Sequence, residues 1–429
     1  MTINLNSYRS SSSCNGKALA FTIAGTILFT IVLFYNIQST PCTERADRPR
    51  IIKTEEERAT VNETYTESVE CSDYAVPQNV TQKGTFWVLN NYVRATERPK
   101  CLESITYTVP ATFPFLENIP ALVDRWQGPI SVAVFAPGED FFRTIDSIAY
   151  LRNCEMDLIE KYVTFHLFFP EDHLPQSSTP LSSLYKDEYD CSEEAPSVLE
   201  ENSYRKKNEL SFPINVARNI AKDNAQTYIV FPSDIELYPS PGLIPKFLKM
   251  FSTKGLTSGR TVYVTPVFEV EERESIPETK SELKKLVASK RARFFHINMC
   301  PSCHAFPRQS EWLSKDDDVD KLGIFAKTKR SGKFNVWEPF YIAVKSDVAL
   351  FAEEITWEGL SDKMVQAYIM CLLDYDFAVL NNVYLIHKPG YKNHRSIQSK
   401  YVNKNGSYKK KTLQPVLETI FGRRNGCAL

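Results

Sequence analysis

Short apolar runs alternate with amphipathic segments along most of the chain. The runs are rich in β-branched and aromatic residues, which is typical of buried strands, and apolar residues between them recur at helical spacing. This alternation predicts an α/β fold with helices packed around a largely parallel sheet. The predicted strands are Ile105–Ala111, Ile130–Ala136, Tyr162–Phe169, Thr227–Pro232, Thr261–Phe268 and Phe377–His387, and the predicted helices are Leu116–Trp126, Phe141–Asn153, Ile214–Asn224, Ser281–Ser289 and Ser361–Asp374.

The N-terminal pattern is different. Residues Ala18–Ile37 form an apolar stretch of twenty residues without a charge, which at 1.5 Å per residue spans a hydrocarbon core of about 30 Å. We interpret it as a transmembrane signal-anchor helix. The alternative is a cleaved signal peptide, whose apolar region usually covers only about 7–15 residues. Basic residues flank both ends, so the positive-inside rule does not set the orientation.

Sequons and cysteines indicate the side of the membrane. N-glycosylation sequons begin at Asn62, Asn79 and Asn405, and they are usable only in a secretory lumen. Nine of the ten cysteines follow the apolar stretch, enough for several disulfides in an oxidising compartment. We therefore predict a type II membrane protein with a cytoplasmic tail (1–17), an anchor (18–37), a charged, Ser/Thr-rich stem (38–75) and a lumenal domain (76–429).

Charge narrows the class of partner. The chain has 51 Lys+Arg against 52 Asp+Glu, a formal net charge of −1, so no global field attracts nucleic acid. Its 43% hydrophobic content excludes wholesale disorder. A basic stretch without Asp or Glu runs from Phe377 to Leu417. We expect Lys400–Lys411 to be a solvated face, whereas Lys388 is better placed to meet diphosphate or an anionic acceptor.

The most informative segment is 227–243, TYIVFPSDIELYPSPGL. An apolar strand ends at Ser233, and ligands of open α/β sheets bind beyond such strand ends. Asp234 and Glu236 then project to the same side, while Ile235 points into the protein. Such a pair can hold Mn²⁺ or Mg²⁺ and leave coordination sites for diphosphate oxygens. The alternative is a solvated turn.

Several blocks in order resemble one enzyme family. PINVARNIAKDNAQTYIVFPSDIELYPSPGL (213–243) resembles the donor-binding block of the glucuronyltransferases that include beta-1,4-glucuronyltransferase and the C-terminal domain of LARGE-type enzymes. Further matching blocks are WQGPISVAV, PVFEVEE, CHAFPRQSEW, WEPFYIA and DFAVLNNVYLIHKPG, and together they cover about Ser104–Phe421. The resemblance implies a GT-A fold, a UDP-sugar donor, Mn²⁺ and inverting transfer in the Golgi.

The resemblance also assigns a metal site. Asp234 and Glu236 take the D-x-D positions, and His387 takes the histidine that completes the site. Glu236 stands where the family more often has Asp, and its extra methylene leaves open whether its contact with the metal is direct or through water. From chemistry alone, a single histidine such as His387 is more often structural.

Further residues are assigned to the donor site by the same blocks. Arg218 can make bidentate hydrogen bonds to uracil or phosphate. The alternative is an exposed arginine on a helix. Glu338 is expected to support donor or acceptor sugar, or else to be a buried structural acid. The full set that we assign to the donor site is Arg218, Asn219, His304, Trp337, Glu338 and Lys388, and Trp312 belongs to the same block as His304.

Inverting transfer needs a carboxylate that takes the proton of the acceptor hydroxyl. Candidates lie in EEITWEGLSD (353–362), a loop that opens a helix, where a carboxylate is held ionised. We expect Glu358, and after it Asp362, to be this base, although Asp362 can also be a plain N-terminal helix charge. For Cys300-Pro-Ser-Cys303, a disulfide or a pair of lumenal thiols is favoured over zinc because no second C-x-x-C completes a four-ligand set.

These inferences predict a Golgi enzyme that moves glucuronic acid from UDP-glucuronate to a glycan on a glycoprotein, such as terminal xylose, by β-1,4 linkage. Association with other Golgi glycosyltransferases is a further expected partnership. Two alternatives remain open. One is a UDP-N-acetylglucosamine-dependent transferase, since no assigned residue distinguishes the sugar. The other is an inactive transferase-like protein that escorts another enzyme.

Overall fold

The structure is a computed structural model that describes residues 77–197, 199–253, 259–315, 321–391 and 399–429. These residues belong to one compact unit, Cys71–Leu429. None of their helices is long and apolar enough to cross a membrane. The predicted tail, anchor and stem lie outside the described residues.

A mixed sheet runs through the described part of the chain in the order β1-β2-β5-β4-β3-β6-β12-β8-β13-β11. Its central strands β5, β4, β3 and β6 are parallel, and antiparallel neighbours flank them. The strands are β1 (Asn79–Lys83), β2 (Phe86–Val93), β3 (Ile105–Thr112), β4 (Ile130–Phe135), β5 (Val163–Pro170), β6 (Ile229–Pro232), β8 (Thr261–Val264), β11 (Ile324–Thr328), β12 (Tyr341–Val344) and β13 (Asp376–Leu380).

A smaller sheet has the order β10-β9-β14-β7, with β7 (Leu237–Pro239), β9 (Val267–Val270), β10 (Ala292–Phe294) and β14 (Leu385–His387). Two predicted strands are therefore wrong as single elements, because each divides between the sheets. Pro266 separates β8 from β9, and proline cannot donate to a strand ladder. Asn382, with φ of 40°, lies between β13 and β14. Four of the six predicted strands are confirmed.

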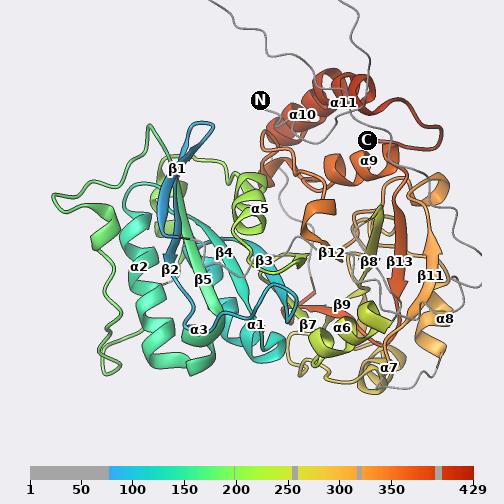
Figure 1. The fold of residues 1–429 in the computed structure, drawn as a ribbon, viewed down its shortest axis with the longest axis horizontal. Coiled ribbons are helices and arrows are strands. Elements are labelled where there is room, and N and C mark those ends of the chain that lie inside the picture. The colour runs from blue at the N-terminus through green and yellow to red at the C-terminus, as the bar shows by residue number, and fades with distance from the viewer. Residues whose placement is uncertain (1–76, 198, 254–258, 316–320, 392–398) are drawn as a thin grey trace, which may run out of the picture. The chain divides into compact units, whose positions relative to one another are not determined.

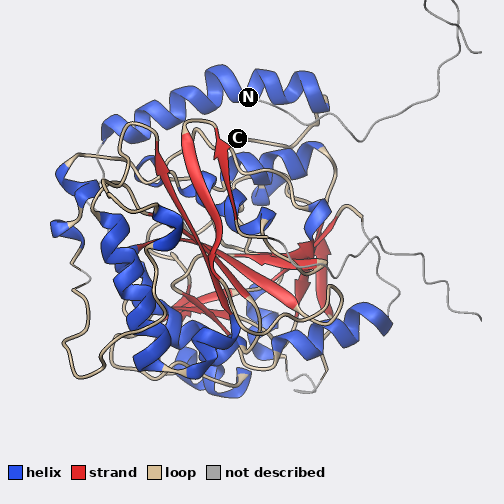
Figure 2. Ribbon diagram, turned by 60° about the vertical axis from the view of Figure 1, so that its left-hand side comes forward, coloured by secondary structure: helices blue, strands red, loops and turns tan. Residues whose placement is uncertain are grey.

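Helices pack on both faces of the large sheet, as Figure 2 shows. Strand periodicity explains the division. Val132 and Val134 of β4 join the core beside α1 and α2, whereas Ala133 and Phe135 face α5. The five predicted helices are confirmed, with shifted ends. The helices are α1 (Ile119–Trp126), α2 (Asp140–Tyr150), α3 (Asp157–Tyr162), α4 (Tyr204–Lys207), α5 (Ile214–Asp223), α6 (Leu243–Thr253), α7 (Lys280–Ala288), α8 (Gln309–Ser314), α9 (Met364–Leu372), α10 (Ser399–Tyr408) and α11 (Gln414–Phe421).

Disulfides join Cys154 to Cys191, Cys371 to Cys427 and Cys300 to Cys303. The last pair is the disulfide favoured for the C-x-x-C segment, so zinc has no thiolate ligands there. The Cys371–Cys427 bond ties the C-terminal segment to α9, and Figure 1 shows α10 and α11 beside that helix.

The sequons differ in accessibility. Asn79 lies exposed in β1. Asn405 is only 5% exposed, and its amide nitrogen donates to the Thr356 carbonyl at 3.1 Å. The backbone of Gly359 lies so close to that amide that even a Cβ would collide with it. The expectation that Asn405 is a usable glycosylation site is therefore wrong for the folded chain, because the site has no room for a sugar. Asn62 lies outside the described residues.

A buried histidine couples folding to pH. His166 of β5 is fully buried; Asn91 N–H donates to its Nδ1 at 2.8 Å, and its Nε2 lies 2.9 Å from Ser131 Oγ. Burial lowers the pKa of His166 from 6.5 to about 3. The unfolded chain therefore binds a proton that the folded chain rejects, and the stability that neutral His166 contributes is fully present above pH 6.5 and is lost as pH falls toward 3.

We expect the free energy of unfolding to include a slope from His166 of about 1.4 kcal/mol per pH unit between these values. Urea denaturation across that range would measure it. His166→Gln should flatten the dependence by that amount, because glutamine does not titrate. An unchanged slope in the variant would contradict a neutral buried His166.

Candidate functional site

The acidic pair lies at the carboxyl end of the parallel strands, between β6 and β7. Ile235 is 3% exposed, so it points inward as predicted. Tyr107 of β3 anchors this loop through its hydroxyl, which lies 2.7 Å from Ser233 Oγ and 2.8 Å from the Leu237 carbonyl. Asp234 and Glu236 are thereby presented on a fixed backbone.

Arg218 of α5 joins two carboxylates. Its side chain is 2% exposed, and Nη2 donates to Asp234 Oδ1 at 2.7 Å. Nη1 donates to Asp362 Oδ2 and, at 2.9 Å, to Asn215 Oδ1. Burial alone would lower the pKa of Arg218, but the two carboxylates outweigh it and raise that pKa. Arg218 is therefore a buried junction and not the exposed helix arginine of the alternative interpretation.

Lys363 is the site residue that sequence reasoning missed. Its Nζ lies 3.4 Å from Asp234 Oδ2, 3.8 Å from Asp362 Oδ1 and 4.8 Å from the centre of the Phe340 ring. Burial opposes its charge, yet the two aspartates raise its pKa. Its only signal in the sequence is its place next to Asp362, which does not distinguish it from a surface lysine.

Asp234, Asp362, Arg218 and Lys363 form one ion cluster of two acids and two bases. Burial would raise the pKa of both aspartates, but Lys363 and Arg218 hold each of these pKa values below its usual range. Both carboxylates are therefore ionised at neutral pH. Asp234 is about one quarter exposed, so it is the member that solvent or a ligand reaches most easily.

Glu236 and His387 form a second pair beside the cluster. The strand register places His387 of β14 opposite Leu237. His387 Nδ1 lies 2.8 Å from the Lys388 carbonyl, which only accepts, so Nδ1 carries the proton. Nε2 lies 3.2 Å from Glu236 Oε1 and makes no hydrogen bond within the described residues. A ring nitrogen and a carboxylate oxygen thus face each other across 3.2 Å, a spacing that suits a shared proton or a bound cation.

Glu338 faces the ion cluster from the segment before β12. It is 8% exposed, and burial raises its pKa; the charge of Lys363 opposes this shift. Lys409, in the basic C-terminal stretch, is half-buried, and burial lowers its pKa against the opposing charges of Glu338 and Asp362. Lys409 therefore departs from the solvated face expected for Lys400–Lys411.

His304 also lies near the cluster, packed among Phe295, Phe340 and His296. Burial, and after it the charges of His296 and Lys363, lowers its pKa well below the usual value, so it is neutral. The rings of Trp312 and Trp337, in contrast, are fully buried in the core.

The remaining predicted residues hold other parts of the fold. Glu358 accepts hydrogen bonds from Arg205 Nη1 at 2.9 Å and from the Phe212 N–H at 3.1 Å. Asn219 donates to the Phe351 carbonyl and to Glu353. Lys388 pairs at the surface with Glu117 at 2.7 Å. Among the residues that the structure describes, no group of three or more His, Cys, Asp or Glu side chains is arranged to hold a metal ion.

Comparison with known proteins gives a consistent result. A family model described as "Glycosyl-transferase for dystroglycan" matches residues 104–421. Beta-1,4-glucuronyltransferase 1 of Mus musculus is 27% identical over 310 residues, 71% of this chain and 72% of that protein. The Danio rerio protein of that name is 28% identical over 301 residues, 64% of this chain and 63% of that protein.

More distant similarities extend to a LARGE-type enzyme and to one solved structure. Xylosyl- and glucuronyltransferase LARGE1 of Mus musculus is 22% identical over 290 residues, which are 66% of this chain but only 31% of that protein. The crystal structure of S. aureus TarS 1-349 in complex with UDP aligns over 74% of this chain and 75% of that chain, at 10% identity and a TM-score of 0.30. A likeness that weak carries no argument.

Proposed function

The chain belongs to the glycosyltransferase family described as "Glycosyl-transferase for dystroglycan", and from this premise we propose that it transfers glucuronic acid from UDP-glucuronate to a glycan acceptor, with inversion, on a GT-A type of α/β fold. The observation that carries the proposal is the ion cluster around Asp234, at the carboxyl end of a parallel strand. The names of the relatives support the choice of sugar. Membership of this glycosyltransferase family supports an enzyme over an inactive escort protein.

We propose Asp234, Glu236 and His387 as the residues that hold Mn²⁺, or Mg²⁺ in its place. The support is the fit of His387 Nε2, which is buried without a hydrogen bond and faces Glu236 at 3.2 Å. Bound there, the ion would carry the charge of the departing UDP. Lys363 then has to give up its contact with Asp234, and at 3.4 Å that contact is the longer of the two that Asp234 makes with cations.

Asp362 is the carboxylate that we propose as the general base, with Glu358 in a structural role. Glu358 is occupied by Arg205 and the Phe212 N–H. Asp362 is preferred because it lies within the cluster that contains Asp234. It is ionised there, but it would have to move off Arg218 to accept a proton, because the pairing that lowers its pKa also weakens it as a base. The acceptor hydroxyl would lose its proton to Asp362 as its oxygen attacks the anomeric carbon and the bond to UDP breaks.

We place the enzyme in the Golgi membrane, with one N-terminal span and a lumenal catalytic domain. The apolar stretch Ala18–Ile37 supports the span. Disulfides such as Cys154–Cys191 support an oxidising compartment.

The proposed lumenal location gives a prediction for glycosylation. In a secretory host, Asn79→Gln should lower the mass of the glycosylated protein by one N-glycan, because Asn79 is exposed. Asn405→Gln should leave the glycan mass unchanged, because Asn405 is buried against Gly359. Mass spectrometry before and after enzymatic deglycosylation measures both. A glycan on Asn405 of the folded protein would contradict the structure.

A donor screen tests the proposed function. The purified full chain would be given a panel of UDP-sugars with a xyloside acceptor, with Mn²⁺ or with a chelator, and UDP release would be measured. We expect release with UDP-glucuronate and Mn²⁺ and its loss with the chelator. Release with UDP-N-acetylglucosamine instead would show that this sugar is the donor. If none of the UDP-sugars gave UDP release, the result would favour the escort protein.

A further inference from the structure

A small cavity lies at the amino ends of the parallel strands, whereas the ion cluster lies beyond their carboxyl ends. Its floor is made by the first residues of parallel strands, including Thr106 of β3, Ser131 of β4 and Thr164 of β5, and by Gln226 after α5. The cavity holds about 40 Å³. Since a single water needs about 10–15 Å³ on this measure, the space is enough for one carboxylate, sulfate or phosphate group.

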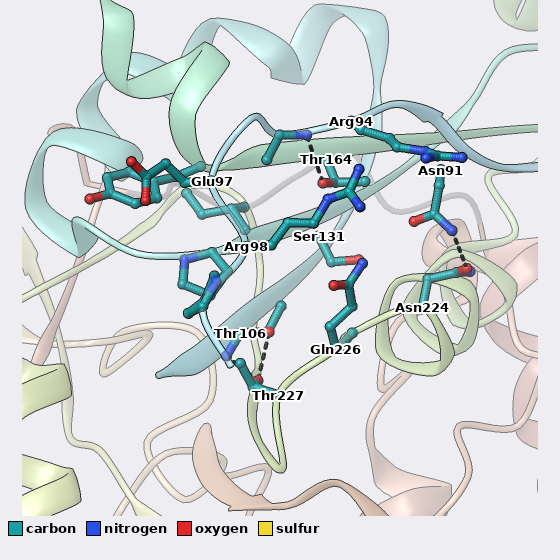
Figure 3. A pocket seen from close by; sticks show the side chains of 16 residues that line it. Asn91, Arg94, Glu97, Arg98, Thr106, Ser131, Thr164, Asn224, Gln226 and Thr227 are labelled. Atoms are coloured by element: carbon teal, nitrogen blue, oxygen red, sulfur yellow. Dashed lines mark hydrogen bonds between the residues drawn. The ribbon is translucent and has the colours of Figure 1, made fainter. Parts of the chain in front are cut away.

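Two arginines enter this cavity from the segment that follows β2, and Figure 3 shows both side chains among its lining residues. Arg98 is exposed and Arg94 is half-buried. Neither guanidinium makes an ion pair or hydrogen bond within the described residues, and Arg94 Nε is buried without a partner. The acid in the lining, Glu97, pairs instead with Lys161 at 3.6 Å. The lining therefore carries two arginines without an ion pair beside one carboxylate that is paired with Lys161.

The other polar groups of the lining are largely committed to one another. The Thr106 and Thr227 hydroxyls share a hydrogen bond of 2.6 Å, and Thr164 accepts from the Ala95 N–H. Gln226 is half-buried and makes no hydrogen bond within the described ranges. An anion would thus meet two guanidiniums and one amide, all able to donate to it.

A wider groove adjoins the cavity. It holds about 550 Å³, and it shares Glu97, Arg98 and Tyr162 with the cavity while adding Trp126 and Gln127. Tyr162 is half-buried at this groove, whereas Trp126 is only 3% exposed and packs into the core. The arrangement has room for an anionic group that is carried on a larger, sugar-sized molecule.

We propose that this cavity is an oxyanion-binding site in which Arg94 and Arg98 bind a carboxylate, sulfate or phosphate group. Charge-assisted hydrogen bonds from guanidinium to oxyanion are among the stronger ones in proteins. The anion can be free in solution or can be borne by a glycan that continues into the groove. The site does not depend on the proposed transfer reaction, because the strands that separate it from Asp234 are about 15–25 Å long.

Anion-induced stabilisation of the full chain tests the proposal. The melting temperature would be measured against inorganic phosphate, sulfate, methyl glucuronoside and a glucuronate-terminated oligosaccharide, with neutral methyl glucoside as the reference. We expect the anions, and not the neutral sugar, to raise the melting temperature by a few degrees at saturation. A stronger effect per mole of the oligosaccharide than of phosphate would identify the glycan-borne source; the reverse would identify a free anion.

Variants assign the effect to the cavity. Arg98→Gln should weaken anion binding about tenfold or more, and Arg94→Gln likewise. Since Arg98 is exposed and makes no ion pair, its replacement should leave the melting temperature without anion unchanged. Arg273→Gln, an exposed arginine outside the cavity, is the matched control and should keep wild-type binding. The proposal is overturned if no anion stabilises the chain, or if the stabilisation persists in Arg98→Gln, or if Asp234→Asn removes it instead.

Discussion

Asp234→Asn should abolish sugar transfer while leaving the protein folded. The substitution removes the charge that faces Lys363 and, in the proposed function, the first metal ligand, so we expect kcat/KM to fall by about a thousandfold or more. Arg218 keeps its contact with Asp362 in this variant, and the asparagine oxygen can still accept from Nη2. UDP release and transfer to a xyloside, with the melting temperature, measure the two effects separately.

Asp223→Asn is the matched control for this change. Asp223 ends α5 only a few residues from Arg218, and its side chain is about half exposed and pairs with Lys83 and Lys222. We expect its replacement to change kcat/KM less than about twofold, because exposed pairs contribute little. Equal turnover by Asp234→Asn and the wild type would show that the cluster around Asp234 is not the catalytic site.

Arg218→Met should cost about 3–5 kcal/mol in the free energy of unfolding, the largest stability effect that we expect of any single change in the site. The arginine is 2% exposed and neutralises Asp234 and Asp362 together. Its loss leaves two carboxylates facing each other with Lys363 as their remaining cation, and breaking a buried pair by removing one partner carries a penalty of this size. Urea denaturation at neutral pH measures it.

A neighbouring cation on the same helix provides the comparison. Lys222→Met also removes a positive charge from α5. Lys222 is 8% exposed, but its ion-pair partner Asp223 is about half exposed and stays solvated when the lysine is lost, so a loss below about 1 kcal/mol is expected. Adding Asp362→Asn to Arg218→Met should restore part of the stability, because one of the unpaired charges is then gone. If Arg218→Met were as mild as Lys222→Met, the cluster would not be a buried electrostatic unit.

The apolar runs predicted much of the fold because burial and strand periodicity are local properties of the sequence. β3 and β4 begin where the runs begin. The prediction failed where one run of β-branched and aromatic residues contributes to two sheets. In Thr261–Phe268, Thr265 and Pro266 separate β8 from β9, and the sheet that each part joins is set by non-local pairing. The pairing of β14 with β7, which brings His387 beside Glu236, is equally non-local.

Only the members of the candidate site that carry a local sequence signal could be predicted. Asp234 stands out because a carboxylate pair follows a buried strand, and Arg218, in the middle of the helix before that strand, was assigned through the family resemblance. Lys363 and Lys409 carry no local signal, since the carboxylates that surround them come from distant segments. Glu358 has the sequence context of a catalytic base, and that role stays a prediction. Its contacts with Arg205 and the Phe212 N–H, both more than 140 residues away, could not be read from the local sequence.

The measurement that tests the central claim most directly is the structure of the transfer product. The full chain would be incubated with UDP-glucuronate, Mn²⁺ and a xyloside, and the linkage and anomeric configuration would be read by NMR spectroscopy. An inverting enzyme converts the α-linked donor to a β-linked glucuronosyl xyloside, and we predict that product, formed by the wild type and not by Asp234→Asn. An α-linked product, or none with any UDP-sugar, would contradict the account.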